Sequence, residues 1–283
     1  LDVYWPVGLR GTQDRSYTFP EGTSDEVKNK AYREAIDAQV DMVKRLLPKG
    51  KTPLFHFTLY TEMLPQYLTG KLDVPSDVTI VWTDDNDGRM RALPKAKDQW
   101  KHGVYYHLAY FSTNTQRTKQ ISHLITPMRV EEEFRKIVEA GATEYMLVNV
   151  SELREFVMEA RILAEITWDA KTAFANPDAA GRFVGWWSRE YFGESAAADV
   201  AKSYRGYYQA LPGWDQIAVG GNAVVQALAA LEAKVAGPPA APAPQTTVAL
   251  SSLEQRKAAY DALLQSVNAT AGTLTGDRQQ FFY

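Results

Sequence analysis

The sequence has no cysteine, so disulfide bonds, thiolate metal sites and a cysteine nucleophile are excluded for this chain. It also has no apolar run near the ~20 residues that a membrane-spanning helix needs, and we expect a soluble protein. The sequence also lacks a large excess of either charge, since 31 basic and 34 acidic residues give a formal net charge of −3. This balance provides no basic surface for nucleic acid or for an anionic membrane, so neither partner is expected.

Several familiar motifs are missing as well. No Gly-x-Gly-x-x-Gly or phosphate-loop lysine pattern follows a predicted strand, which weakens a nucleotide-binding interpretation. There is no Gly-x-Ser-x-Gly elbow and no His-x-x-x-His pair. The segment that starts at Asp84 does not match a calcium-binding loop, because Arg89 and Lys95 stand where the loop needs glycine and glutamate. We therefore expect neither a metal ion nor a cofactor.

Up to about residue 172, short apolar stretches alternate with amphipathic ones. Such alternation predicts parallel βαβ units, either in an open doubly wound sheet or in part of a (β/α)8 barrel. Thr23, with Glu26 three residues later, predicts a capping box at the start of the first helix. The predicted strands are Val3–Leu9, Pro53–Leu59, Val78–Thr83, Val104–Tyr110 and Tyr145–Val150. The predicted helices are Asp25–Leu47, Met63–Leu68, Val130–Ala140 and Phe156–Trp168.

The character of the sequence changes after about Pro177. Alanine-rich amphipathic stretches predict a helical bundle domain over residues 173–283. A proline-alanine stretch at 237–247 cannot be helical and predicts a solvated loop. The predicted helices of this part are Phe183–Phe192, Ser195–Leu211, Trp214–Val235 and Leu250–Leu274.

Each predicted strand is followed by side chains that bind or transfer protons. Because the carboxyl ends of parallel strands meet at one edge, we expect these side chains to form one site. The set comprises Arg10, Asp14, Tyr60, Glu62, Asp84, Asn86, His107, Tyr110 and Asn149. Paired carboxylates are what glycoside hydrolysis needs, and the amide, phenol and imidazole groups suit a polyhydroxylated substrate.

Simpler interpretations of these residues stay open. Arg10 and Asp14 could form an ion pair on a surface turn. His107 could be a core histidine whose hydrogen bonds are satisfied. In the pocket interpretation, by contrast, strand alternation turns Asp84 and Asn86 into the site and Asp85 away from it.

Longer segments resemble glycoside hydrolase family 115, the xylan α-1,2-glucuronidases. The similar segments are VGLRGTQD (7–14), LYTE (59–62), DVTIVWTDDNDGRMRALP (77–94), HGVYYHLAY (102–110), EAGATEYMLVNVSELR (139–154) and RQQFFY (278–283). The resemblance implies that residues 1–172 are the later part of a catalytic (β/α)8 TIM-type barrel. It implies that an all-α helical bundle domain follows, and that the remainder of the barrel lies outside this chain.

The activity implied by this resemblance is hydrolysis of (4-O-methyl)-D-glucuronic acid side groups from glucuronoxylan or its oligosaccharides, with inversion and without a cofactor. Glu62 and Asp14 match the family's catalytic carboxylates. The remaining matches are to substrate-binding residues: Arg10, Tyr60, Asp84, Asn86, His107, Tyr110 and Asn149. The family usually has methionine and histidine where this chain has Thr12 and Gln13.

The resemblance also implies a secreted enzyme of hemicellulose breakdown, located outside the cell or in the periplasm, and it leaves a homodimer open. The alternative function is a carbohydrate-binding relative without catalytic activity, or an inactive fragment of a larger enzyme.

Overall fold

The computed structural model describes residues 3–11, 16–60, 62–95, 100–109, 111–112, 117–118, 123, 125–150, 153–210 and 250–282. The chain divides into two compact units, and each is described by itself. Unit 1 comprises Leu1–Leu108 and Arg129–Ser151. Unit 2 comprises Ala109–Met128 and Glu152–Tyr283. The prediction of a domain boundary near residue 172 stays a prediction.

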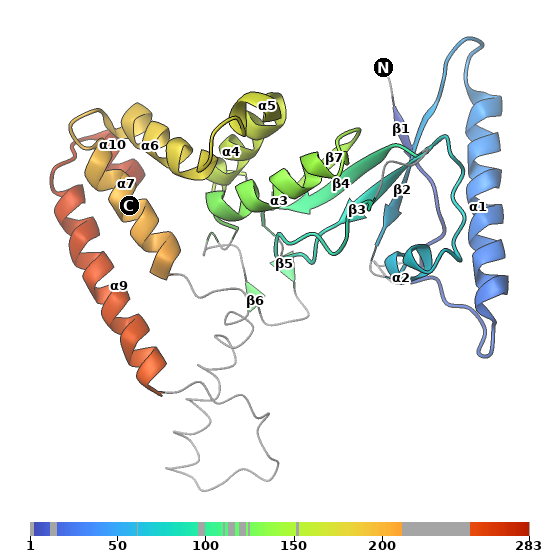
Figure 1. Ribbon diagram of the computed structural model, residues 1–283, viewed down its shortest axis with the longest axis horizontal. Helices are drawn as coiled ribbons and strands as arrows, with labels where there is room; N and C mark the ends of the chain where they lie inside the picture. Colours follow the sequence, from blue (N-terminus) through green and yellow to red (C-terminus); the bar gives the residue numbers. More distant parts are fainter. Residues whose placement is uncertain are drawn as a thin grey trace, which may run out of the picture. The chain divides into compact units, whose positions relative to one another are not determined.

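A five-stranded parallel sheet forms the centre of unit 1, in the order β1-β2-β3-β4-β7 (Figure 1). The strands are β1 (Tyr4–Pro6), β2 (Leu54–Leu59), β3 (Val78–Thr83), β4 (His102–His107) and β7 (Met146–Asn149). All four pairings are parallel, which confirms the α/β prediction. Every carboxyl end therefore lies at the same edge of the sheet.

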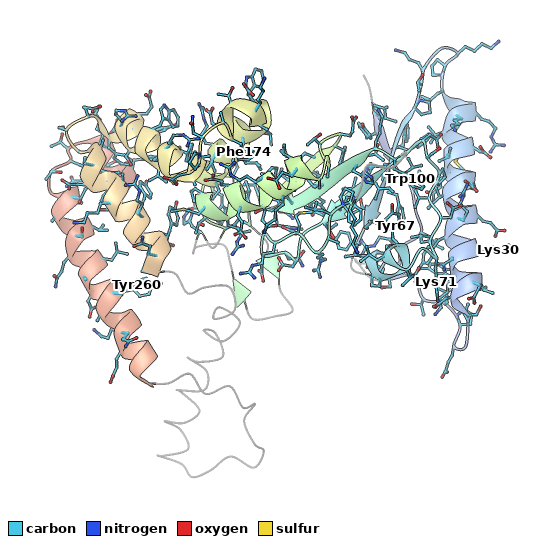
Figure 2. All side chains as sticks on the ribbon, in the orientation of Figure 1. Lys30, Tyr67, Lys71, Trp100, Phe174 and Tyr260 are labelled. Atoms are coloured by element: carbon cyan, nitrogen blue, oxygen red, sulfur yellow. The ribbon has the colours of Figure 1, made fainter. Side chains whose placement is uncertain are left out.

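Alternation along the strands separates a covered face from a polar face. In β2 the buried residues are Phe55, Phe57 and Leu59. They share one hydrophobic core cluster with the residues of α1 (Asp25–Leu46) that recur at helical spacing, Tyr32, Ile36 and Val40. In Figure 2, Tyr67 and Trp100 lie on the α1 side of the sheet, where both pack against this cluster. Tyr67 belongs to the short helix α2 (Leu64–Leu68).

The first helix is capped one residue later than the sequence predicts. Ser24, not Thr23, occupies the N-cap, and its side chain accepts a hydrogen bond from the Val27 amide. Thr23 instead donates its hydroxyl to the Pro20 carbonyl at 2.6 Å. Only Thr23 has a glutamate three residues later, but its hydroxyl is used by the turn at Pro20, and Ser24 caps the helix instead.

Helix α3 (Pro127–Glu139) covers the outer face of β4. The rings of Tyr106 on β4 and Phe134 on α3 meet edge to face, with centroids 5.1 Å apart. Tyr106 is fully buried, and burial raises the pKa of its hydroxyl well above the ordinary value. Its neutral hydroxyl donates to the Gly88 carbonyl at 3.0 Å, which anchors the loop after β3.

A ring cluster occupies the amino-terminal half of the opposite face. The ring of Tyr145, just before β7, stacks on His56 of β2 at 4.9 Å and contacts Tyr4 of β1 at 5.0 Å. Gly103 lies beneath it, and a Cβ atom there would meet the Tyr145 carbonyl oxygen at 2.4 Å. Burial lowers the pKa of His56, which favours a neutral imidazole in this stack.

Most of the described residues of unit 2 are helical. Its helices are α4 (Val157–Trp168), α5 (Ala170–Ala173), α6 (Ala179–Phe192), α7 (Ala197–Ala210), α9 (Leu250–Ala271) and α10 (Asp277–Phe282). Helix α7 contacts both α6 and α9. A two-stranded antiparallel ribbon, β5 (Phe111–Ser112) and β6 (Arg117–Thr118), belongs to the same unit.

The predicted helix Trp214–Val235 and the loop at 237–247 lie outside the described residues. Among the described helices, none has the length and apolarity that crossing a membrane would require.

We predict that Gly103→Ala destabilises unit 1 by at least ~3 kcal/mol, because the new methyl group would collide with backbone in a central strand pair. Urea denaturation followed by tryptophan fluorescence measures the change. Gly185→Ala on α6 is the matched control, since a Cβ there has nothing within 4 Å. Replacing a helical glycine by alanine should stabilise by ~0.5–1 kcal/mol. Equal stability of Gly103→Ala and the parent protein would contradict the collision.

Candidate functional site

The carboxyl edge of the sheet gathers polar and aromatic side chains from five successive strand ends. Arg10 follows β1, and Tyr60 and Glu62 follow β2. Asp84 follows β3, His107 ends β4 and Asn149 ends β7. The parallel register explains this, because Thr83 of β3 pairs with Tyr105 of β4, and His107 with Asn149. All these residues belong to unit 1.

Arg10 and Glu62 form an ion pair across the ends of β1 and β2. The Nε of Arg10 donates to Oε1 of Glu62 at 2.8 Å, and the two side chains are 31% and 13% exposed. The guanidinium carbon also lies 4.2 Å from the centroid of the Tyr60 ring, a cation–π distance. Two contacts thus fix the orientation of Arg10. Asp14 lies outside the described residues, so its pairing with Arg10 stays a prediction.

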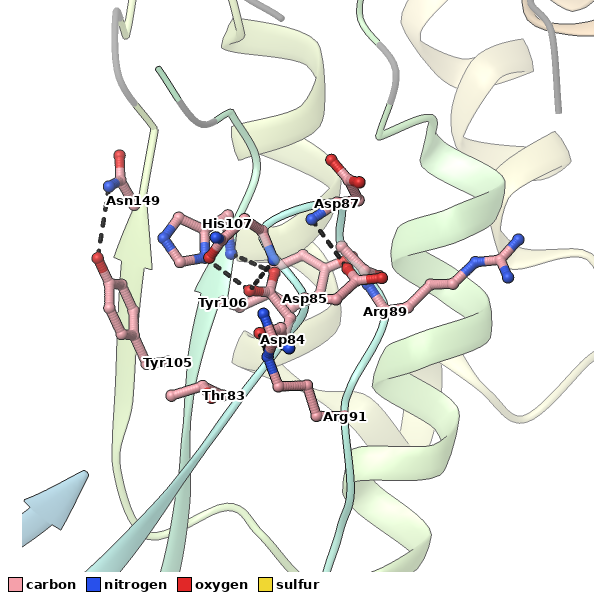
Figure 3. A network of polar contacts seen from close by, with 12 residues as sticks. Thr83, Asp84, Asp85, Asp87, Arg89, Arg91, Tyr105, Tyr106, His107 and Asn149 are labelled. Carbon is pink, nitrogen blue, oxygen red and sulfur yellow. Dashed lines mark hydrogen bonds and ion pairs between the residues drawn. The ribbon is translucent and has the colours of Figure 1, made fainter. Parts of the chain in front are cut away.

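Tyr105 connects this pair to the rest of the edge. Its ring lies 6.1 Å from that of Tyr60 and 4.6 Å from that of His107. Its hydroxyl accepts a hydrogen bond from the Asn149 amide at 3.4 Å (Figure 3). The contacts therefore run without interruption from β1 to β7 along the sheet edge.

A buried acid–imidazole pair holds the centre of the edge. Oδ1 of Asp84 lies 2.6 Å from Nδ1 of His107, and Oδ2 accepts the His107 backbone amide at 2.8 Å. The two side chains are 0% and 1% exposed. Figure 3 shows Asp84 between His107 and Arg91, whose Nε donates to the Asp84 carbonyl at 2.7 Å. The pair is buried in the protein interior, so His107 as a core histidine and His107 as a substrate-binding residue both stay open.

The acidic run after β3 forms a turn. Asn86 has a φ of 68°, in the left-handed region, and its amide donates to Oδ1 of Asp84 at 3.1 Å. The backbone is not extended there, so strand alternation does not decide where the Asn86 side chain points, and that prediction is wrong. Oδ1 of Asp85 accepts the amides of Asp87 and Arg89 at 2.9 and 3.1 Å, which closes the turn.

Two residues of the predicted site, Asp14 and Tyr110, lie outside the described residues. The structure brings the other seven to one edge: Arg10, Tyr60, Glu62, Asp84, Asn86, His107 and Asn149. Their roles stay predictions.

Tyr105 was missed in the sequence, although a signal for it exists. In a strand, residues two apart share a face, so Tyr105 had to lie beside His107 and opposite Tyr106. Arg91 had no comparable signal, because its contact depends on the turn that returns the chain to Asp84.

Within the described ranges, no group of three or more histidine, aspartate or glutamate side chains is arranged to hold a metal ion.

The fold and this edge define an α/β protein that presents carboxylate, guanidinium, imidazole and phenol groups at the ends of parallel strands. Comparison with known families makes the assignment specific. The model of glycosyl hydrolase family 115 matches residues 1–213, and the chain belongs to this family.

A solved structure is similar as well. It is described as a "novel family GH115 4-O-Methyl-alpha-glucuronidase, BtGH115A, with specificity for decorated arabinogalactans". The TM-score is 0.74 at 18% identity, a likeness that shows the fold alone. The alignment covers 99% of this chain and 35% of that chain, so this chain spans about a third of its length. No curated protein matches.

We predict that Asp84→Ala destabilises unit 1 by about 3–5 kcal/mol, because it leaves a buried histidine without its acidic partner. The control is Asp77→Ala before the same strand. Asp77 pairs with Lys44 at 2.7 Å, but both side chains are about half exposed, so its loss should cost less than ~1 kcal/mol. Chemical denaturation measures both variants, and similar costs would argue against a structural role for the Asp84–His107 pair.

Proposed function

We propose that this chain contributes the carboxyl-edge active site of a glycoside hydrolase that removes glucuronic acid, or its 4-O-methyl form, from a plant polysaccharide. The observation that carries the proposal is the Arg10–Glu62 pair at the carboxyl edge of a parallel sheet, in a chain of glycosyl hydrolase family 115. In this proposal residues 1–172 are the later part of a (β/α)8 barrel, and a helical bundle domain follows.

Glu62 and Asp14 are the proposed catalytic carboxyl groups of an inverting reaction. One carboxylic acid protonates the glycosidic oxygen as its bond to the anomeric carbon breaks. The other, ionised, takes a proton from a water molecule that attacks the anomeric carbon from the opposite face. Protons and charge balance over the step, and neither a metal ion nor a cofactor takes part.

The other residues of the edge bind the sugar in this proposal. Arg10 is the natural partner for a uronate carboxylate, because a guanidinium presents several parallel donors and the Tyr60 ring already fixes its plane. The proposed partners of the sugar hydroxyl groups are Asn149, His107, Tyr110 and Asn86. Asp84 is fully buried against His107, so it serves the site by orienting that imidazole.

Two polysaccharides suit the proposal. The sequence resemblance points to glucuronoxylan with α-1,2-linked glucuronate, whereas the similar solved structure is described as specific for decorated arabinogalactans. Both present a glucuronate side group, so the uronate-binding residues serve either one. An extracellular or periplasmic location would bring the protein to both.

We predict that the intact protein releases uronic acid from 4-O-methylglucuronoxylan and that Glu62→Gln lowers kcat by ~100-fold or more, because it removes a proton-transferring group. A colorimetric uronic acid assay with arabinogalactan in parallel measures this. Glu144→Gln is the control, since Glu144 is half exposed and pairs with Lys101 at 3.5 Å. Carbohydrate binding without uronate release by the parent protein would favour a non-catalytic relative.

We predict that the β-anomer of glucuronic acid appears first, because a single displacement at an α-linked anomeric carbon inverts its configuration. Proton NMR of the anomeric signals during the first minutes of hydrolysis measures the ratio before mutarotation equalises it. Initial release of the α-anomer would mean retention and would overturn the assignment of an inverting pair.

A further inference from the structure

Unit 2 contains a cavity of about 470 Å³, built only from its own residues. This size lies within the range of small-ligand sites. Helices α4, α6, α7, α9 and α10 contribute to its lining, as does the segment that carries His123. Its aromatic lining residues are Trp187, Tyr204, Tyr207, Tyr208, Phe281 and Phe282.

A histidine–glutamate pair lies at this cavity. Nδ1 of His123 is 2.9 Å from Oε1 of Glu159, which is fully buried on α4, while the His123 side chain is about one-third exposed. Burial alone would lower the pKa of His123, but the hydrogen bond to Glu159 and the negative charges of Glu159 and Glu155 together outweigh it and raise the pKa. The contact with Glu159 fixes the orientation of the imidazole, and His123 lines the cavity.

The pair is poorly explained as a purely structural feature. Within the described residues, Oε2 of Glu159 has no hydrogen-bond partner. A buried charged pair is commonly no more stable than apolar residues of the same volume. A buried carboxylate with one oxygen unpartnered, beside a cavity, therefore points to a ligand that uses the oriented imidazole.

The tyrosines add neutral hydroxyl groups to the aromatic lining. Burial raises the pKa of Tyr207 to about 12, with a smaller contribution from Tyr260 and Glu159. The ring of Tyr207 meets that of His123 edge to face, with centroids 6.3 Å apart. Aromatic faces beside hydroxyl and imidazole groups match a sugar ring, which has apolar C–H faces and a hydroxyl rim.

Charge narrows the ligand class. His123 pairs with Glu159, and the two other charged lining residues, Arg154 and Glu155, have opposite charges. The lining thus lacks the net positive charge that would select an acidic sugar. A neutral sugar therefore fits the cavity best.

We propose that this cavity binds a neutral pyranose unit of the polysaccharide main chain, separately from the uronate-binding edge of unit 1. The proposal rests on the proposed function, because it takes a polysaccharide as the substrate. The cavity would increase affinity for the polymer without touching the reacting glycosidic bond.

The test uses oligosaccharides without uronic acid, so that binding does not depend on the proposed active site. Xylohexaose and a galactan hexasaccharide are titrated into the intact protein by isothermal titration calorimetry, which distinguishes the two main chains. We predict that Tyr207→Ala weakens binding of the preferred oligosaccharide about tenfold, as expected for loss of a central aromatic contact. His123→Ala is the second variant, and thermal unfolding verifies that both variants fold.

Trp168→Ala is the matched control, because Trp168 is 91% exposed in the same unit and does not line the cavity. Its affinity should equal that of the parent protein. Three outcomes would each overturn the proposal. The first is unchanged affinity in both Tyr207→Ala and His123→Ala, and the second is an equal loss of affinity in all three variants. The third is no binding by the parent protein. Uronic acid release is measured on the same preparations. If no uronic acid is released but the cavity variants lose binding, only the hydrolase function is overturned. If uronic acid is released but the cavity variants bind as the parent protein does, only the cavity proposal is overturned.

Discussion

The carboxyl edge of the sheet depends on one buried carboxylate. Asp84 accepts the backbone amide of His107 and the amide of Asn86, and it also bonds the His107 ring. These three contacts connect the end of β3 to the end of β4 and shape the turn that directly follows β3. The buried imidazole then packs against Tyr105, which reaches Tyr60 on one side and Asn149 on the other. Loss of one partner from such a buried pair is strongly destabilising, because it leaves the other polar group buried without compensation. The arrangement of the whole carboxyl edge therefore depends on this pair.

The parallel arrangement and the position of the site could be predicted from sequence. The apolar run Val78–Thr83 matches β3 in both bounds, because a fully buried strand ends where acidic residues begin. Because the strands are parallel, the polar residues at their carboxyl ends lie along one edge of the sheet. The partner of Arg10 could not be predicted, because Glu62 is 52 residues away and competes with Asp14 four residues away. Local spacing also failed at Asn86, where a left-handed residue replaced strand alternation.

The polar face of the sheet divides along its strands into two halves. Towards the amino ends, Tyr145 reaches across Gly103 to His56 and fills space with stacked rings. Towards the carboxyl ends, Arg10, Glu62 and His107 concentrate charge and hydrogen-bonding groups. Packing and proposed chemistry are thus carried by different residues of the same strands. The Asp84–His107 pair contributes to both, because it is buried and lies at the carboxyl edge.

The chain passes between the two units three times, after Leu108, Met128 and Ser151. No single cleavage point can therefore yield both units whole. Ending the chain at residue 151 keeps the sheet strands together but removes the segment 109–128 from the helices with which it belongs. Beginning the chain at residue 152 leaves those helices without the same segment, and with it without His123. The two units are consequently a poor choice for separate expression, and any exchange of the helical unit between relatives must transfer both of its segments.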